Sequence, residues 1–236
     1  MNLDALTPAQ IAARLAAPPA ERAAFLRAAA MAGHAEAQCV YAQMLLDGTG
    51  VAADPRAALG WFTRAAQQHH PMALNMVGRC YDLGWGTAPD KARAAACYRI
   101  AHDLGLVEAT YNLATLMTLG EGVAEDKARA LALFEQAAAR SYAKAWNYVG
   151  SFAEDGWACD RDMMRAADCY ARAAEGGDFR GAFNHARMLL AAGRLDAALP
   201  WLAQAAEHGT PAFVAKAAAW LRDTHAPRTA REAFAC

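Results

Sequence analysis

The chain has 236 residues, of which 56% are hydrophobic, so it can bury ample apolar surface without a metal ion or a second chain. Its net charge of −1 provides no long-range attraction for nucleic acid or for acidic membranes. No apolar run approaches the roughly 20 residues that a membrane-spanning helix needs. The N-terminal stretch also lacks the uninterrupted apolar core of a signal peptide, and we therefore expect a cytoplasmic protein.

Helices are predicted along the whole chain, because alanine is abundant and Ile, Val and Thr are few. The first elements are a degenerate helix over residues 7–16 and a second helix over 20–33, separated by Pro18 and Pro19. We treat residues 1–34 as an N-terminal cap. Its departure from the units that follow is expected, because one face of a terminal unit meets water.

A repeat of 36 residues begins after this cap. It appears as an alanine series, a glycine series and an aromatic series: Ala37, Ala73, Ala109 and Ala145; Gly48, Gly84, Gly120 and Gly156; Phe62, Tyr98, Phe134 and Tyr170. Such a period indicates stacked units, each of which buries its apolar face only against its neighbours. Arrays of this kind present a long curved surface, and they usually bind other molecules and rarely perform chemistry.

Residues 109–144 show the elements of one unit most clearly. The first helix covers 109–119, and Gly120 follows where the end of a helix favours a residue that tolerates positive φ. Asp126 caps a second helix over 127–140, so each unit is predicted to be an αα-hairpin. Small residues on the first helix let the paired helices approach closely; they are Gly78, Ala114 and Gly150.

The array closes with shorter elements. Four units occupy 35–181, and a shorter, tetratricopeptide-like unit occupies 182–209, with helices over 181–192 and 196–208. A C-terminal cap helix is predicted over 210–224, and the tail 225–236 has little reason to be ordered. We expect residues 1–236 to form a single solenoid domain.

The repeated pattern AxYNLxxxxxxGxGVxxDxxxAxxxFxxAA resembles the Sel1-like repeat, a relative of the tetratricopeptide repeat. It is carried by residues 37–66, 73–101, 109–138 and 145–174, and the resemblance covers roughly residues 20–210. The resemblance implies an all-α fold, a right-handed α-solenoid of about five Sel1/TPR-like repeats with N- and C-terminal capping helices. It also implies that the first helix of each pair lines the concave face.

By analogy with tetratricopeptide proteins, positions three, four and seven of each first helix lean toward a concave groove. Asparagine side chains both donate and accept hydrogen bonds, and tyrosines provide rigid amphipathic area, so this lining suits an extended peptide. The candidate binding residues are Asn75, Arg79, Tyr111, Asn112, Thr115, Asn147, Tyr148, Ser151, Asn184 and His185.

Structural interpretations compete with binding at several of these positions. Asn112 serves equally well to tie adjacent helices together, whereas Asn75, Asn147 and Asn184 are expected to face the groove. Tyr111 and Tyr148 fit either a packed or an exposed position. Beyond the groove, Trp85 and Trp157 follow the repeat glycines and act either as hydrophobic plugs or as a second contact surface.

Motifs for catalysis are sparse. Ser141 and Lys144 match the SxxK pattern of penicillin-recognising serine enzymes, but no SDN or KTG partner motif exists. The histidines and cysteines show no zinc-binding spacing. An enzyme or small-molecule site would need titratable groups that converge in one pocket. The groove candidates for such a site are spread over several repeats: Arg79, Glu154, His185 and Arg187.

The cysteines are expected to be reduced. Cys97 and Cys169 occupy an apolar repeat position, as does Cys80, and free cysteine is commonly a small core hydrophobe. The remaining cysteines, Cys39, Cys159 and Cys236, form no CxxC motif.

We therefore expect a non-enzymatic, bacterial-type adaptor or scaffold that binds a partner peptide or helix in its groove, without a cofactor, a metal or nucleic acid. Three alternatives stay open. They are a small-molecule binder or β-lactam-type hydrolase, a protein associated with immunity or secretion, and a protein that self-associates through its loop tryptophans or Cys236.

Overall fold

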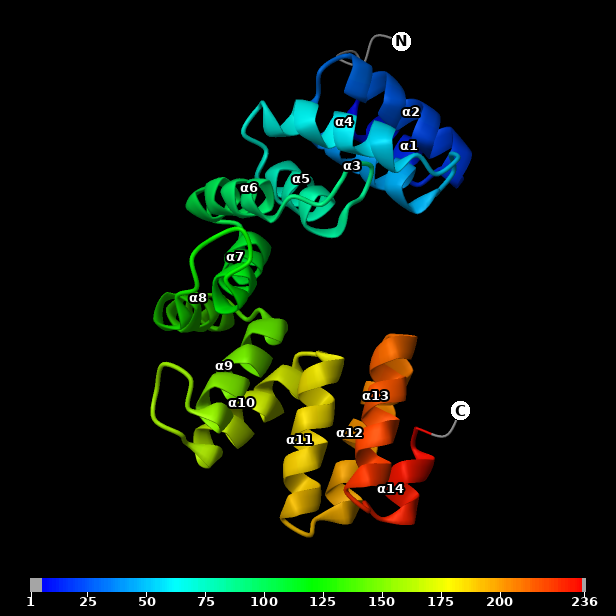
Figure 1. The fold of residues 1–236 in the computed structure, drawn as a ribbon. Helices are drawn as coiled ribbons and strands as arrows, with labels where there is room; N and C mark the ends of the chain where they lie inside the picture. Colours follow the sequence, from blue (N-terminus) through cyan, green and yellow to red (C-terminus); the bar gives the residue numbers. More distant parts are fainter. Residues whose placement is uncertain (1–5, 235–236) are drawn as a thin grey trace. The chain divides into compact units, whose positions relative to one another are not determined.

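The structure, a computed structural model, describes residues 6–234, and every regular element in that range is a helix (Figure 1). The chain divides into two compact units, residues 1–125 and 126–236, each described by itself. The first unit contains α1 (Pro8–Leu15), α2 (Pro19–Met31), α3 (Ala35–Asp47), α4 (Pro55–Ala66), α5 (Pro71–Leu83), α6 (Lys91–Asp103) and α7 (Val107–Leu119). The second contains α8 (Lys127–Ala139), α9 (Ala143–Asp155), α10 (Met163–Glu175), α11 (Phe179–Ala191), α12 (Leu195–His208), α13 (Pro211–Asp223) and α14 (Arg228–Glu232).

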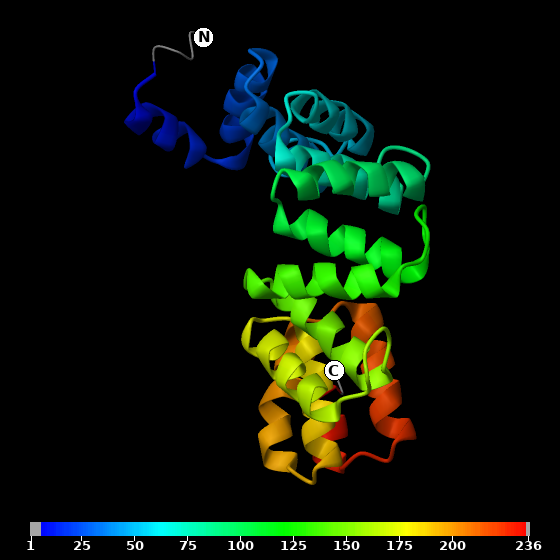
Figure 2. The ribbon, with the colours of Figure 1, turned by 90° about the vertical axis from the view of Figure 1, so that its left-hand side faces the viewer.

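The repeated residues set the ends of these helices. The odd-numbered helices α3, α5, α7 and α9, which we call first helices, each end at a glycine with φ between 66° and 76°. The second helices α4, α6, α8 and α10 each begin after an aspartate whose side chain accepts a hydrogen bond from a backbone N–H of the first turn. Within each unit the helices pack as hairpins, as both views show for α11 and α12 (Figures 1 and 2).

A second glycine in the loop allows close contact between neighbouring repeats. Gly86 has a φ of 71°, and a Cβ built there would lie 2.3 Å from the carbonyl oxygen of Pro55 at the start of α4. Only glycine fits at such a distance. The corresponding loop position after α9 holds Ala158, which adopts a φ of 57°. An L-residue with a side chain is strained in this region of φ.

The core of the hairpins alternates between two side-chain combinations. Gly78 on α5 faces Tyr98 on α6, and a Cβ added to the glycine would lie 2.6 Å from the tyrosine ring. Gly150 stands in the same relation to Tyr170, at 2.7 Å. The other repeats hold alanine and phenylalanine at these positions, namely Ala42 with Phe62 and Ala114 with Phe134. The glycine therefore makes room for a ring whose hydroxyl must reach a partner further along the helix.

That partner is an acid one turn after each glycine. The Tyr98 hydroxyl donates to Asp82 Oδ2 at 3.1 Å, and the Tyr170 hydroxyl donates to Glu154 Oε2 at 2.7 Å. Both tyrosine rings are at most 1% exposed, so each hydroxyl needs a partner in the protein. The phenylalanine repeats have Leu46 and Thr118 at the acid position.

The predicted all-α fold of αα-hairpins is confirmed, but the expectation of a tail without order is wrong. Residues 228–232 form α14, in which Ala230 is buried, and Phe234 follows with 5% exposure. The ring of Phe234 contacts Phe183 of α11, with centroids 5.9 Å apart. Two apolar side chains four residues apart therefore fix the tail against α11, α12 and α13.

Candidate functional site

The predicted groove residues divide equally between the two units. In the first unit they lie on α5 and α7: Asn75, Arg79, Tyr111, Asn112 and Thr115. In the second unit they lie on α9 and α11: Asn147, Tyr148, Ser151, Asn184 and His185. All are partly exposed except Asn75 and Asn147.

The asparagines connect neighbouring first helices. The side-chain amide of Asn112 donates to Asn75 Oδ1 at 2.8 Å, and Asn184 donates to Asn147 Oδ1 at the same distance. Asn75 is 3% and Asn147 7% exposed, so the expectation that these two face an open groove is wrong. The physical reason is that a buried amide oxygen needs a donor, which the next first helix provides. Asn112 does tie two adjacent helices together, because its amide joins α7 to α5.

In the first unit, Arg79 lies against the loop that follows α5. Its guanidinium carbon is 4.7 Å from the centroid of the Trp85 ring, a distance typical of a cation–π contact. Thr115 on α7 donates its hydroxyl to the backbone oxygen of Tyr111 at 3.0 Å. These side chains therefore have local partners as well as exposed surface.

The two loop tryptophans pack against their own units. Trp157 contacts Phe152 edge-on at 5.7 Å, Lys127 lies over its ring at 5.1 Å, and 41% of the residue stays exposed. Trp85 is half-buried. Both rings thus have the packing of a hydrophobic plug, and their role as a second contact surface stays a prediction.

In the second unit, the partly exposed candidates lie along one stripe of α9 and α11. Tyr148 stacks on Phe134 with ring centroids 4.5 Å apart, and Ser151 donates to the backbone oxygen of Asn147 at 3.1 Å. On α11, Met188 follows Asn184 by one helical turn and is also partly exposed. We call the surface formed by Tyr148, Ser151, Asn184, His185 and Met188 the α9–α11 face.

His185 has an unusual environment on this face. Its ring lies edge-on to Trp201 with centroids 5.4 Å apart, and burial lowers its pKa. Its Nδ1 atom is buried without a hydrogen-bond partner among the residues that the structure describes. Such a group is rare in a protein interior and carries a free-energy cost.

Two of the four titratable candidates converge. Both terminal nitrogens of Arg187 donate to the carboxylate of Glu154, at 2.8 and 2.5 Å, and Tyr170 donates to the same carboxylate. The Arg187 hydrogen bonds lower the pKa of Glu154, against the opposing effect of burial, and the Tyr170 bond lowers it further. A carboxylate held ionised in this way connects α9 to α10 and α11, and it is poorly suited to exchange protons at neutral pH.

A pocket of about 400 Å³ continues from the α9–α11 face toward α13. Met188 and Arg187 border it from α11, and Trp220 borders it from α13, with its ring centroid 6.0 Å from the Arg187 guanidinium. The rest of its wall is mostly apolar, apart from Thr224 and His225: Met163, Leu190, Ala191, Ala226 and Pro227. We call this cavity the α11–α13 pocket. Trp220 lies in the predicted C-terminal cap helix over 210–224, and the sequence does not indicate the pocket because the Arg187–Trp220 contact joins residues of different repeats.

The residues considered for catalysis or for metal binding do not form a comparable site. Ser141 and Lys144 are exposed around the turn between α8 and α9, and Ser141 has a φ of 63°. Within residues 6–234, no group of His, Cys, Asp and Glu side chains has the arrangement of a metal site. None of the described helices is long and apolar enough to cross a membrane.

The described cysteines are free thiols, and Cys236 lies outside the described residues. Burial raises the pKa of Cys39 to about 12 and those of Cys80 and Cys169 to about 11. These three thiols are therefore protonated at neutral pH and unreactive.

Known proteins share this architecture. A Sel1 repeat protein from Oxalobacter formigenes matches the chain with a TM-score of 0.73 at 22% identity, and the match covers 91% of this chain and 96% of that one. The protective antigen c5321 of uropathogenic Escherichia coli strains, which displays an SLR fold, matches at 27% identity and a TM-score of 0.66 over 87% of this chain. The match spans 45% of the length of c5321. The immunity protein Pa5087 of Pseudomonas aeruginosa matches at 17% identity, with a TM-score of 0.57, over 85% of this chain and 75% of its own.

No curated protein matches the chain. The Sel1 repeat model, in contrast, matches four consecutive segments: residues 35–70, 71–106, 107–142 and 143–178. These segments cover more than half of the chain and coincide with its 36-residue period. The chain belongs to the Sel1 repeat family, whose members are helical repeat proteins that generally mediate protein–protein interactions and generally lack enzymatic activity.

Proposed function

We propose that the protein is an adaptor that binds a segment of a partner protein on the α9–α11 face, with an apolar side chain of that segment in the α11–α13 pocket. The observation that carries this proposal is the combination of a fixed apolar cavity with a half-exposed polar stripe that leads to it. A buried apolar anchor provides most of the affinity in many interfaces, and polar groups around it set orientation. The buried thiols suit a reducing compartment, and we place this function in the cytoplasm.

The geometry favours a peptide segment over a small metabolite. The polar wall of the pocket is held in place by the Glu154–Arg187 pair and by the Arg187–Trp220 contact. The stripe beside it offers hydrogen-bonding side chains, Ser151 and Asn184, that a peptide backbone can reach. His185 is the one polar side chain of the face with an unpartnered buried nitrogen among the described residues, and a bound segment that shifts its ring would relieve that cost.

The test is a selection of peptides from a displayed random library on the immobilised full chain, followed by affinity measurements with the selected peptide. Met188→Arg should weaken binding at least about tenfold, because a charged side chain would occupy the entrance of the pocket. Gln136→Arg is the matched control, since Gln136 is exposed on α8 and lies outside the pocket. A substitution of Asn147 would not test the site, because its side chain is buried and accepts a hydrogen bond from Asn184.

Retention of the peptide by Met188→Arg would refute the assigned site. An equal loss of peptide affinity in Met188→Arg and Gln136→Arg would point to an effect on folding, which circular dichroism of both variants would reveal. A peptide that binds the wild type and the control but not Met188→Arg would support the proposal.

A further inference from the structure

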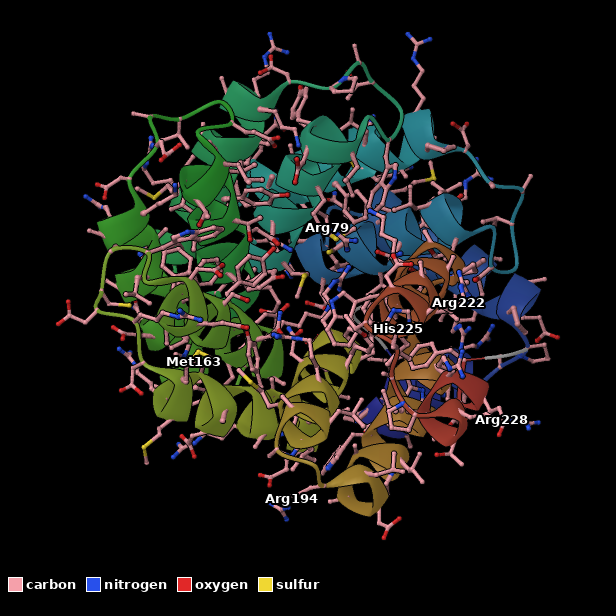
Figure 3. All side chains as sticks on the ribbon, turned by 60° about the horizontal axis from the view of Figure 1, so that its bottom comes forward. Arg79, Met163, Arg194, Arg222, His225 and Arg228 are labelled. Atoms are coloured by element: carbon pink, nitrogen blue, oxygen red, sulfur yellow. The ribbon has the colours of Figure 1, made fainter. Side chains whose placement is uncertain are left out.

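A second surface with its own chemistry lies where α13 meets α14. Arg222 of α13 and Arg228 and Arg231 of α14 border one hollow of about 350 Å³. Figure 3 labels two of them, Arg222 and Arg228, on these two helices. The rest of the wall is Ala218, Phe234 and Glu232. We call this site the arginine hollow.

The chain holds these arginines in place through its tail. The backbone turns after α13 at His225, which has a φ of 53°, and α14 begins after Pro227. Ala230 and Phe234 then enter the core of the second unit, which leaves the neighbouring positions Arg228 and Arg231 exposed. Arg222 is on the stripe of α13 that carries Ala218, one turn earlier. An unordered tail would hold no such group of guanidinium ions together.

The charges in the hollow are unbalanced. Glu232 is its one acidic residue, and the carboxylate pairs with Arg228 at 2.7 Å. Arg222 and Arg231 have no ion pair with any residue in the described range 6–234. Residues 179–236 contain seven Arg and Lys and four Asp and Glu, whereas the whole chain has a net charge of −1. The surplus positive charge is thus local to this end of the chain.

We infer that the arginine hollow binds an acidic segment of a partner protein, in which two carboxylates flank an apolar side chain. Guanidinium groups bind carboxylates through paired hydrogen bonds, and the side chain between them would contact Phe234 and Ala218. A single exposed ion pair adds little affinity, so recognition requires at least two of the arginines together. A nucleic acid is the weaker candidate, because its repeated phosphates need a longer basic track than one hollow on a chain of net charge −1. This inference does not depend on the α11–α13 pocket, which has different lining residues.

The experiment uses the full chain and a fluorescein-labelled peptide, Gly-Ser-Asp-Glu-Leu-Glu-Asp-Ser-Gly, with fluorescence anisotropy as the measurement. The same peptide with Asn and Gln in place of its acids is the ligand control. The double variant Arg222→Gln/Arg231→Gln should bind the acidic peptide about tenfold more weakly. Arg129→Gln/Arg194→Gln removes the same charge at exposed positions of the second unit outside the hollow, and it should change affinity less than about twofold.

A third variant tests the assignment in the opposite direction. Glu232→Gln removes the carboxylate that occupies Arg228, so the acidic peptide should bind about threefold more tightly. The inference is overturned if the peptide and its amide control bind equally, if both double variants lose affinity equally, or if Glu232→Gln weakens binding. Tighter binding of a labelled single-stranded oligonucleotide than of the acidic peptide, lost in the Arg222/Arg231 variant, would assign the hollow to nucleic acid and would also overturn it.

Discussion

Exchanging the glycine and tyrosine of one repeat for the alanine and phenylalanine of its neighbour should show strong coupling between the two positions. In Gly78→Ala, the new Cβ would lie 2.6 Å from the Tyr98 ring, about 1 Å inside a normal carbon–carbon contact. Overpacking of this kind costs about 1–3 kcal/mol, and the better helix preference of alanine offsets about 1 kcal/mol of it. We expect a net loss of about 1 kcal/mol in the free energy of unfolding.

Tyr98→Phe removes the hydroxyl that donates to Asp82, and it should cost about 1–2 kcal/mol because the acceptor is a half-buried carboxylate. In the double variant the phenylalanine ring is no longer held by Asp82 and can move away from the new methyl group. Ala42 and Phe62 coexist in this way, both fully buried, in the first repeat. The double variant should therefore be more stable than the sum of the single effects by about 1 kcal/mol or more.

Urea unfolding followed by circular dichroism would measure the four proteins of this cycle, with the slope of each transition checked for equality. Additivity within about 0.3 kcal/mol would refute the reasoning, because it would mean that the ring does not limit the space beside Gly78. A destabilised Tyr98→Phe with an unaffected Gly78→Ala would contradict it as well.

Three further outcomes follow from features of the second unit. Ala158→Gly should raise the free energy of unfolding by about 0.5–1 kcal/mol, since glycine relieves the strain at a φ of 57°, and a lower urea midpoint would contradict this. Phe234→Ala should cost about 2–4 kcal/mol through loss of the tail's anchor, and an unchanged thermal midpoint would show that the tail is not anchored. The Arg187 bonds lower the pKa of Glu154, so their stabilisation is fully present above its ordinary pKa near 4.5 and is lost as the pH falls through the lower folded value. Wild type should therefore lose more stability than Glu154→Gln between about pH 5 and 3, and parallel pH profiles of the two proteins would refute this assignment.

The repeat made the fold predictable from sequence, because the C-terminal ends of the first helices and the N-terminal ends of the second helices carry residue types with a local physical reason. The glycines after the first helices and the aspartates before the second helices appear in the structure in those roles. Local rules of this kind need no knowledge of distant contacts. The packing of the tail is a feature that such local rules do not predict. Nothing local indicates that Ala230 and Phe234 would pack against α11, because that contact joins segments about 50 residues apart in the sequence.

The candidate site was predictable only in part. Periodicity identified which positions of the first helices lie on one stripe, but not which of them are covered by the next helix, as Asn75 and Asn147 are. The spacing of the asparagines distinguishes the buried positions from the exposed ones. Asn75 precedes Asn112 by 37 residues, and Asn147 precedes Asn184 by the same number, which indicates amide pairs between adjacent first helices. Glu154 and Arg187 are 33 residues apart, and no other acid in the sequence has an Arg or Lys 33 residues after it, so no repeated spacing indicates this contact.

The alternation of tyrosine and phenylalanine repeats bears on how the chain arose. Glycine, tyrosine, the acid and the loop tryptophan all recur after 72 residues, at Gly78 and Gly150, Tyr98 and Tyr170, Asp82 and Glu154, and Trp85 and Trp157. A 72-residue period, twice the length of one repeat, is expected when a gene segment that encodes two hairpins is duplicated as one block. A natural relative that gained or lost such a block would keep its asparagine pairs and its tyrosine–acid pairs intact.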